Sequence, residues 1–204
     1  MQITVTQGYS LSDDRLAAMF EDRKKLFVDL FNWDVPVVDG RYELDAFDGA
    51  DATYLVASGE GEVHAGSMRL LPTSKPHILG ELFTELCDGP VPVGPGIFEI
   101  TRLCLPCRLG AKRRLKVRDR LISAMVDHAR ASGITTLTGV VGWNFLEQIL
   151  IMGWECEALG RPHHRDGAWL GAFRIDLDEH TISELTATGI YTPGAFAAPS
   201  AQLA

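Results

Sequence analysis

The hydrophobic positions of this chain follow two periods, that of strands and that of helices. Alternating patterns and short apolar runs predict strands over residues 2–6, 52–58, 63–71, 96–105, 135–141, 153–159 and 168–177. Apolar residues at helical spacing predict a helix over 12–32, capped by Ser10 or Ser12. The same spacing predicts helices over 78–86, about 115–131 and 143–151.

The order of these elements suggests a fold class. A meander of strands leads to a central strand that feeds a long helix, and this order resembles the acyl-CoA N-acyltransferase (GNAT) fold. The resemblance implies an α/β fold with a mixed, mainly antiparallel sheet, flanked by helices in a three-layer sandwich. We expect one domain over 1–192, because no low-complexity linker divides the chain, and a frayed tail rich in Ala and Pro over 193–204.

Composition narrows the functional classes. The chain has 204 residues, 46% of them hydrophobic, a formal charge of −8 and a pI of about 5.2, which argues against nucleic acid as a partner. No apolar run reaches membrane-spanning length, and the first residues lack the features of a signal peptide, so we expect a cytoplasmic protein that binds no membrane. The four cysteines are then expected to be free thiols. Cys104 and Cys107 have the spacing of half a zinc site, but no fitting second half follows, and we predict no metal.

Charged residues inside apolar strands are the first sign of a site. Arg69, Glu99 and Arg102 all interrupt strand patterns, and the segment RYELDAFD (41–48) brings three more carboxylates. A charge in an apolar strand is costly unless it is paired. One interpretation is a structural ion-pair network of Glu43, Arg69 and Glu99. The other is a polar pocket for a zwitterionic ligand, and the two are compatible.

An ordered set of residues carries a family resemblance. Arg23, Phe27 and Trp33, then Glu43, Asp45 and Asp48, then Met68–Arg69, Phe83, and Glu99 with Arg102 are similar to the pattern of the LuxI-type acyl-homoserine-lactone synthases of bacterial quorum sensing. The resemblance implies that an acyl group passes from a thioester, on acyl carrier protein or coenzyme A, to the amine of S-adenosylmethionine (SAM). Lactonisation then releases methylthioadenosine. SAM and the thioester are substrates, and no separate cofactor is expected.

The resemblance also implies roles for single residues. Glu99 is the candidate general base for the SAM amine, with Arg102 and Asp45 as further catalytic candidates. Backbone N–H groups of a bulged strand near 102–105 are expected to stabilise the oxyanion. The carboxylates would hold the positive charges of SAM, and the arginines its carboxylate. The predicted SAM-binding residues are Arg23, Phe27, Trp33, Asp45, Asp48, Arg69, Phe83 and Arg102.

Two further segments are candidates for binding the acyl donor. The basic run over 108–120 precedes or opens a helix, where an anion is favoured, and we predict donor docking at Arg108, Lys112, Arg113 and Arg114. The run does not distinguish coenzyme A from carrier protein. The predicted acyl pocket consists of Leu121, Met125, Val140, Gly142, Trp143 and Leu146. Family members that accept 3-oxo chains have Ser or Thr near 141–143, and their absence here argues against that preference.

Two other functions fit the same sequence. Another GNAT-type enzyme would acylate a small amine from acyl-CoA without releasing methylthioadenosine. A non-catalytic sensor would bind SAM or acyl-CoA and turn over neither. A SAM-dependent methyltransferase is disfavoured, because no glycine-rich loop follows the first strand.

Overall fold

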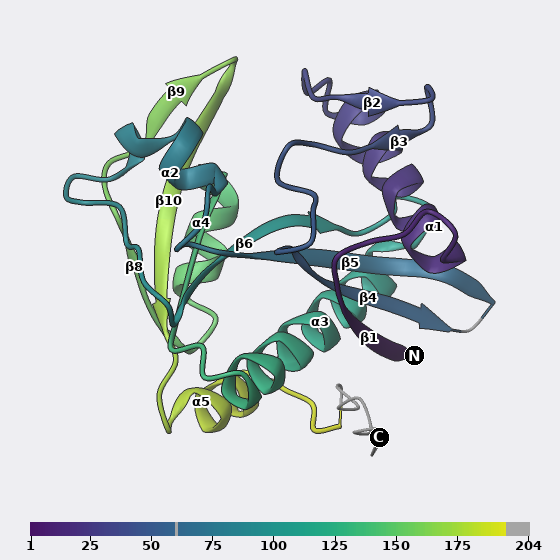
Figure 1. Ribbon diagram of the computed structural model, residues 1–204. Coiled ribbons are helices and arrows are strands. Elements are labelled where there is room, and N and C mark those ends of the chain that lie inside the picture. Colours follow the sequence, from purple (N-terminus) through teal and green to yellow (C-terminus); the bar gives the residue numbers. More distant parts are fainter. Residues whose placement is uncertain (60, 195–204) are drawn as a thin grey trace.

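The fold is built on a single eight-stranded sheet. A computed structural model describes residues 1–59 and 61–194 (Figure 1). The strand order is β1-β4-β5-β6-β7-β10-β8, and β9 pairs with β10. The strands of this sheet are β1 (Gln2–Gln7), β4 (Thr53–Gly59), β5 (Glu62–Pro72), β6 (Ile97–Cys104), β7 (Thr136–Gly142), β8 (Glu155–Ala158), β9 (His163–Arg165) and β10 (Ala168–Asp176). A small hairpin of β2 (Val37–Val38) and β3 (Tyr42–Glu43) lies apart from it.

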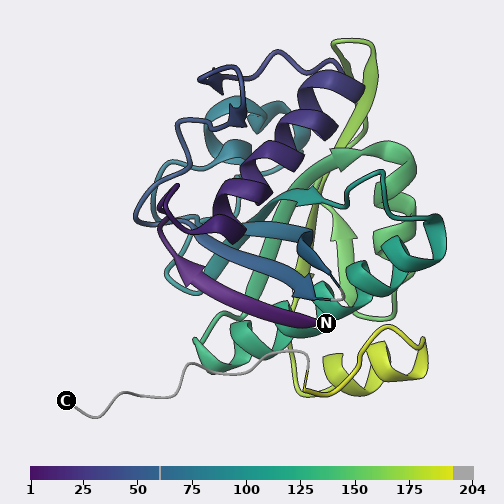
Figure 2. The same cartoon turned by 90° about the vertical axis from the view of Figure 1, so that its right-hand side faces the viewer.

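Helices cover both faces of the sheet, which confirms the three layers that the element order predicted. The helices are α1 (Asp14–Arg23), the π-helix η1 (Lys24–Leu30), α2 (Ile78–Leu82), the 3₁₀ turn η2 (Thr84–Leu86), α3 (Ala111–Ala131), α4 (Trp143–Leu150) and α5 (Thr181–Ala187). Figures 1 and 2 show α1 against one face of β4 and β5, and α3 against the other. The largest apolar cluster lies on the α3 side and joins α3 to α4 and α5, whereas a smaller one packs α1 against β4 and β5.

The strand pairing is antiparallel throughout the main sheet except at one place. β6 pairs in parallel with β7, because the chain crosses from one to the other through α3. This is the mixed, mainly antiparallel sheet that was predicted. The parallel pairs run from Ile97–Thr136 to Ile100–Gly139, while both strands continue beyond that point. The ends of β6 and β7 are thus free of each other on the side where the charged residues lie.

A β-bulge interrupts β6 beside this divergence. Arg69 pairs with Thr101, but Ser67 pairs with Cys104, so β6 carries one extra residue between them. Arg102 lies there with a φ of 52°, a conformation that non-glycine residues rarely adopt. The bulge lets the side chains of Thr101, Arg102 and Cys104 all face α1, and it confirms the expected bulged central strand.

The sequence placed most elements correctly but missed several boundaries. Asp13, not Ser10 or Ser12, caps α1 by accepting the N–H of Arg15. The long first helix changes from α to π at Lys24, and α3 starts at Ala111 rather than near 115. β2, β3 and α5 were not predicted. The tail expected over 193–204 lies outside the described residues from 195 onward.

Among residues 1–59 and 61–194, no helix has the length and hydrophobicity required to cross a membrane.

Candidate active site

Three arginines and three carboxylates interlock between α1, the loop after β3, and strands β5 and β6. Arg23 donates from Nε to Glu43 at 2.5 Å and from Nη1 and Nη2 to Asp48 at 2.9 and 2.8 Å. Arg69 makes a forked pair with Asp45 at 2.6 and 3.0 Å, and its Nη1 lies 2.7 Å from Asp48. Arg102 bridges Glu43 and Asp45 at 2.9 and 2.7 Å. We call these six residues the ion-pair cluster.

The loop of the cluster is held by its own side chains. Asp48 accepts the backbone N–H of Asp45, and Asp45 accepts that of Phe47, both at 2.9 Å. Such turns around Asp preorganise a loop without help from a sheet. Tyr54 of β4 donates its hydroxyl to Asp48 at 2.8 Å, and Thr101 accepts Arg69 Nε at 2.9 Å. The sequence analysis missed Tyr54 and Thr101, although both are polar residues in the strands that face this loop.

The formal charges of the cluster cancel, which explains why the segment 41–48 contains so many carboxylates. Burial by itself would raise the pKa of Asp48, but Arg23 and Arg69 outweigh it and hold that pKa below its usual range. The side chains of Glu43 and Asp48 are 0% exposed and those of Arg23 and Arg69 are 1% exposed, so a ligand cannot reach them in this conformation. Asp45 and Arg102, at 8% and 9%, form the accessible edge. The direct SAM contacts predicted for Arg23, Asp48 and Arg69 do not fit this burial.

Aromatic rings form a wall beside that edge. Phe27, in the π-helix, stacks on Trp33 with ring centroids 4.8 Å apart and an interplanar angle of 12°. The helix ends at Leu30, Asn32 just beyond it has a φ of 55°, and the N–H of Trp33 bonds back to the carbonyl of Phe27. Arg102 lies over both rings, 5.5 Å from the centroid of Phe27 and 5.7 Å from that of Trp33. Half-exposed Phe31 completes the group, and the sequence analysis had not singled it out.

Glu99 is tied to the start of α2. Its carboxylate accepts the backbone N–H groups of Ile78 and Leu79 at 2.7 and 2.9 Å, so it holds the start of α2. Among the described residues Glu99 makes no direct ion pair, so it joins the predicted network with Glu43 and Arg69 only through the longer-range effect of the charges of Arg69 and Arg102. The register explains this, because Glu99 pairs with Leu71, two residues along β5 from Arg69. Burial raises its pKa to about 7, against the effect of the two N–H donors.

Phe83 lies directly after the last residue of α2. It packs with Phe47 on the apolar cluster under α1, and the guanidinium of Arg165 lies 4.5 Å from its ring centroid. It thereby links the loop to the β9–β10 hairpin, which rises beside α2 in Figure 1.

An apolar cavity of about 80 Å³ opens on the other face of β6, between its bulged end, α3, α4 and β7. Its wall includes Thr101, Arg102 and Leu103, so it meets the ion-pair cluster at the bulge. The remaining lining residues are Met68, Ile100, Arg118, Ile122, Met125, Val140, Val141, Phe145, Ile149, Met152, Trp154, Phe173 and Ile175.

Only part of the predicted acyl pocket lines this cavity. Met125 and Val140 do, whereas Leu121 and Leu146 are 0% exposed and belong to the core beside it. Gly142 is exposed, and Trp143 packs on the core at the start of α4. The sequence could not separate these sets, because the inner face of a helix and a cavity wall are equally apolar.

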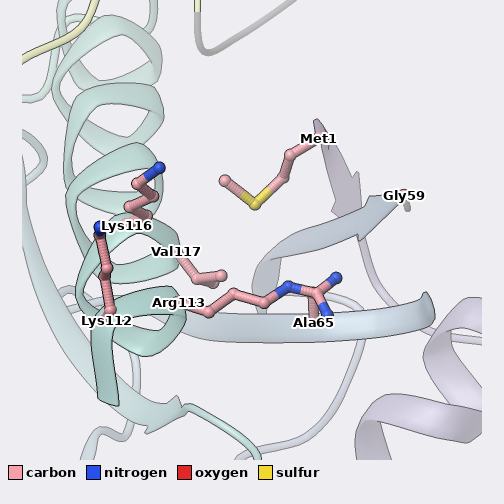
Figure 3. Close-up of a pocket in the computed structure, with 7 residues that line it drawn as sticks. All are labelled: Met1, Gly59, Ala65, Lys112, Arg113, Lys116 and Val117. Carbon is pink, nitrogen blue, oxygen red and sulfur yellow. The ribbon is translucent and has the colours of Figure 1, made fainter. Parts of the chain in front are cut away.

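Three of the four predicted donor-docking residues are linked through Glu62 or a shared cleft. Arg108 donates to Asp22 at 2.8 Å and to Glu62 at 3.1 Å, and Arg113 lies 3.7 Å from the same Glu62. Lys112 and Arg113, with Lys116, line a cleft of about 310 Å³ on the β1–β4–β5 side of α3, whereas Arg114 does not. Figure 3 shows Arg113 extending along β5, and the side chain of Met1 reaching toward α3 across the cleft.

Comparison with known proteins decides the family. The family model described as "Autoinducer synthase" matches residues 7–185. The chain belongs to the autoinducer synthase family. An acyl-homoserine-lactone synthase of Ralstonia nicotianae is 30% identical over all of both chains.

Solved structures agree with this assignment to the autoinducer synthases. The CoA-dependent acyl-homoserine lactone synthase BjaI, in a structure with SAM and isopentyl-CoA, superposes with a TM-score of 0.80 at 27% identity, covering 92% of this chain and 89% of BjaI. An acyl-CoA N-acyltransferase from Pseudomonas aeruginosa superposes with a TM-score of 0.56 at 18% identity, covering 85% and 99%. This second likeness shows the GNAT-like fold alone, and it confirms the predicted fold class.

Proposed function

We propose that this autoinducer synthase transfers an acyl group from a thioester to the amine of SAM and then closes the lactone. One observation carries the proposal: Arg102 belongs both to the ion-pair cluster and to the wall of the apolar cavity. The zwitterionic end of SAM and the end of an acyl chain would therefore meet at the bulge of β6. BjaI, whose solved complex holds SAM and isopentyl-CoA, is similar over most of both chains.

The polar edge would bind SAM through two groups. Among the described residues, Nε and Nη2 of Arg102 are occupied by Glu43 and Asp45, whereas Nη1 has no partner and can receive the SAM carboxylate. Asp45 would attract the ammonium group from the same edge. The rings of Phe27 and Trp33 would face the sulfonium, since a cation is favoured over an aromatic ring. Arg23, Asp48 and Arg69 would act from behind by fixing these groups.

Two bonds form and two break in the reaction. The neutral amine attacks the thioester carbonyl, and the thiol leaves with the proton that the amine loses. The SAM carboxylate then attacks its own γ-carbon, and methylthioadenosine leaves with the electrons of the carbon–sulfur bond. Backbone N–H groups around the bulge at 102–104 are candidates for stabilising the oxyanion of the first step.

Glu99 remains our candidate base. A pKa of about 7 suits proton transfer at neutral pH. Because both of its oxygens accept N–H groups of α2, this role requires one of them to be released or a water to carry the proton.

Lys112 and Arg114, on the first turn of α3, remain candidates for binding the donor's phosphates or an acidic carrier protein. The four free thiols fit a cytoplasmic enzyme.

The test is release of methylthioadenosine by purified protein supplied with SAM and a panel of acyl-CoA and acyl-carrier-protein donors. Asp45→Asn should lower kcat/KM at least about 100-fold, because it removes the charge at the accessible edge. Asp51→Asn, at an exposed position of the same loop, is the matched control and should keep full activity. Acylated product without methylthioadenosine would favour another GNAT-type acyltransferase, and binding without any turnover would favour a sensor.

A further inference from the structure

Arg118 is a cation in the wall of an otherwise apolar cavity. It lies on the inward stripe of α3, one turn before Ile122 and two before Met125, and all three line the cavity. Its side chain is 17% exposed. A guanidinium in such a wall is costly unless its donors are used.

Those donors are only partly used. Nε and Nη2 of Arg118 both donate to one oxygen of the neighbouring Asp119, at 2.9 and 2.7 Å. Asp119 is itself 26% exposed, so this is a pair at the solvent edge. Within residues 1–59 and 61–194, Nη1 has no hydrogen-bond partner. One donor of this cavity-lining side chain is thus left without a protein partner among these residues.

The strand register places Arg118 near the reacting end of the cavity. α3 follows β6 directly and returns to the start of β7, so its first half lies beside the end of β6, where Arg102 and Leu103 are. The opposite end of the cavity is at Ile175 of β10. Ile175 pairs with Leu137 of β7, which in turn pairs with Phe98 of β6, four residues before Arg102. A substituent close to the thioester would face Arg118, whereas the end of the acyl chain would lie near Ile175.

The size of the cavity limits the chain. Its volume of about 80 Å³ is smaller than the ~150 Å³ of an engineered apolar cavity that accepts benzene. The cavity therefore favours short acyl groups over long ones.

We infer that Arg118 is a specificity-determining residue that selects short acyl donors carrying an oxygen acceptor at the third carbon. Nη1 would donate a hydrogen bond to the oxygen of a 3-hydroxy or 3-oxo group. The inference rests on the proposed acyl transfer. It names the substrate class of that same site.

The test compares kcat/KM for 3-hydroxybutanoyl and butanoyl thioesters, each on coenzyme A and on carrier protein. Arg118→Met keeps the length of the side chain but removes the donors, and it should lower the ratio of the two kcat/KM values about tenfold or more. Arg118→Lys should restore part of the ratio. Arg120→Met, on the same helix but outside the cavity wall, should leave it unchanged.

Two outcomes overturn the inference. One is an unchanged ratio in Arg118→Met; if it comes with an equal loss for both donors, Arg118 acts on the thioester or the carrier arm instead. The other is a wild-type preference for the butanoyl thioester. If the wild type turns over no donor, the proposed function fails instead. Calorimetric titration of the two CoA donors without SAM then still tests the selectivity, because it needs no turnover.

Discussion

The two faces of β6 use opposite kinds of chemistry. On the α1 face, Arg102 is one of the six charged side chains of the ion-pair cluster. Their formal charges cancel, and the inner members of the cluster are closed to solvent. On the α3 face, Ile100 and Leu103 border a small apolar cavity. The charged face specifies geometry through directional hydrogen bonds, whereas the apolar face specifies only size. Because β6 has an extra residue at Arg102, this one strand contributes side chains both to the ion-pair cluster and to the wall of the cavity.

The comparison also shows where each face is vulnerable. Deleting one member of a buried ion pair leaves an uncompensated charge, while deleting a methyl group from a cavity wall leaves space that a longer substrate can fill. Substitutions on the α1 face should therefore lower stability and activity together. Changes in the cavity wall on the α3 face should also lower stability, but the activity that remains should have an altered donor selectivity.

The largest effect is expected for Arg23→Met. The variant removes the partner of two buried carboxylates, Glu43 and Asp48, and should lower the free energy of unfolding by ~3–5 kcal/mol. Denaturant unfolding monitored by circular dichroism measures it. Arg15→Met is the control, because its pair with Asp13 is at the surface and should contribute only ~0–1 kcal/mol. An equal loss of unfolding free energy in both variants would mean that burying the ion-pair cluster does not increase its contribution to stability.

A pH-dependent effect is expected at Glu99. Burial raises the pKa of the folded protein's Glu99 from 4.5 to about 7, so the folded state binds this proton more tightly than the unfolded state. Its contribution to stability is complete below pH 4.5 and is lost as the pH rises through 7. A shift of this size corresponds to about 3 kcal/mol.

Glu99→Gln should remove that dependence. Unfolding free energies of the wild type and of Glu99→Gln, measured at pH 5.0 and 7.5, should show the wild type losing about 2 kcal/mol more than the variant between the two values, because part of the shift falls below pH 5.0. Asp48 titrates with the opposite sign, since its lowered pKa gives stability that is lost only in acid, so it does not confuse this window. A parallel pH profile in the two proteins would contradict the raised pKa of Glu99.

The smallest expected effect is a change in donor preference, and it distinguishes two neighbouring residues on α3. Ile122 lines the cavity, whereas Leu121 is enclosed in the core. Truncating either to Ala should lower the free energy of unfolding by ~2–5 kcal/mol. Only Ile122→Ala should raise kcat/KM for a donor two carbons longer, by about tenfold relative to the shorter one. A similar change in Leu121→Ala would show that the acyl chain enters the core that the sequence first suggested.

Much of the site could be predicted because charges in apolar strands are rare. Arg69 and Arg102 stand out in β5 and β6 for that reason, and three carboxylates beside one another predict partners of opposite charge. The apolar cavity could not be predicted in the same way. Ile122 and Leu121 are both apolar and adjacent, and only the packing of α3 decides which of them faces the space at the divergence of β6 and β7.

The sequence by itself determined the order of the elements, the fold class and the ordered set of charged and aromatic residues that marks the family. Periodicity and residue type are local properties, and a single chain displays them without its fold. Only the tertiary structure decided that Glu99 holds α2 instead of an arginine, that Arg102 lies on a bulge, and that Arg118 lines the cavity. Each depends on strand register or helix rotation, which residues far apart in the chain set together, so the three-dimensional packing was required to see them.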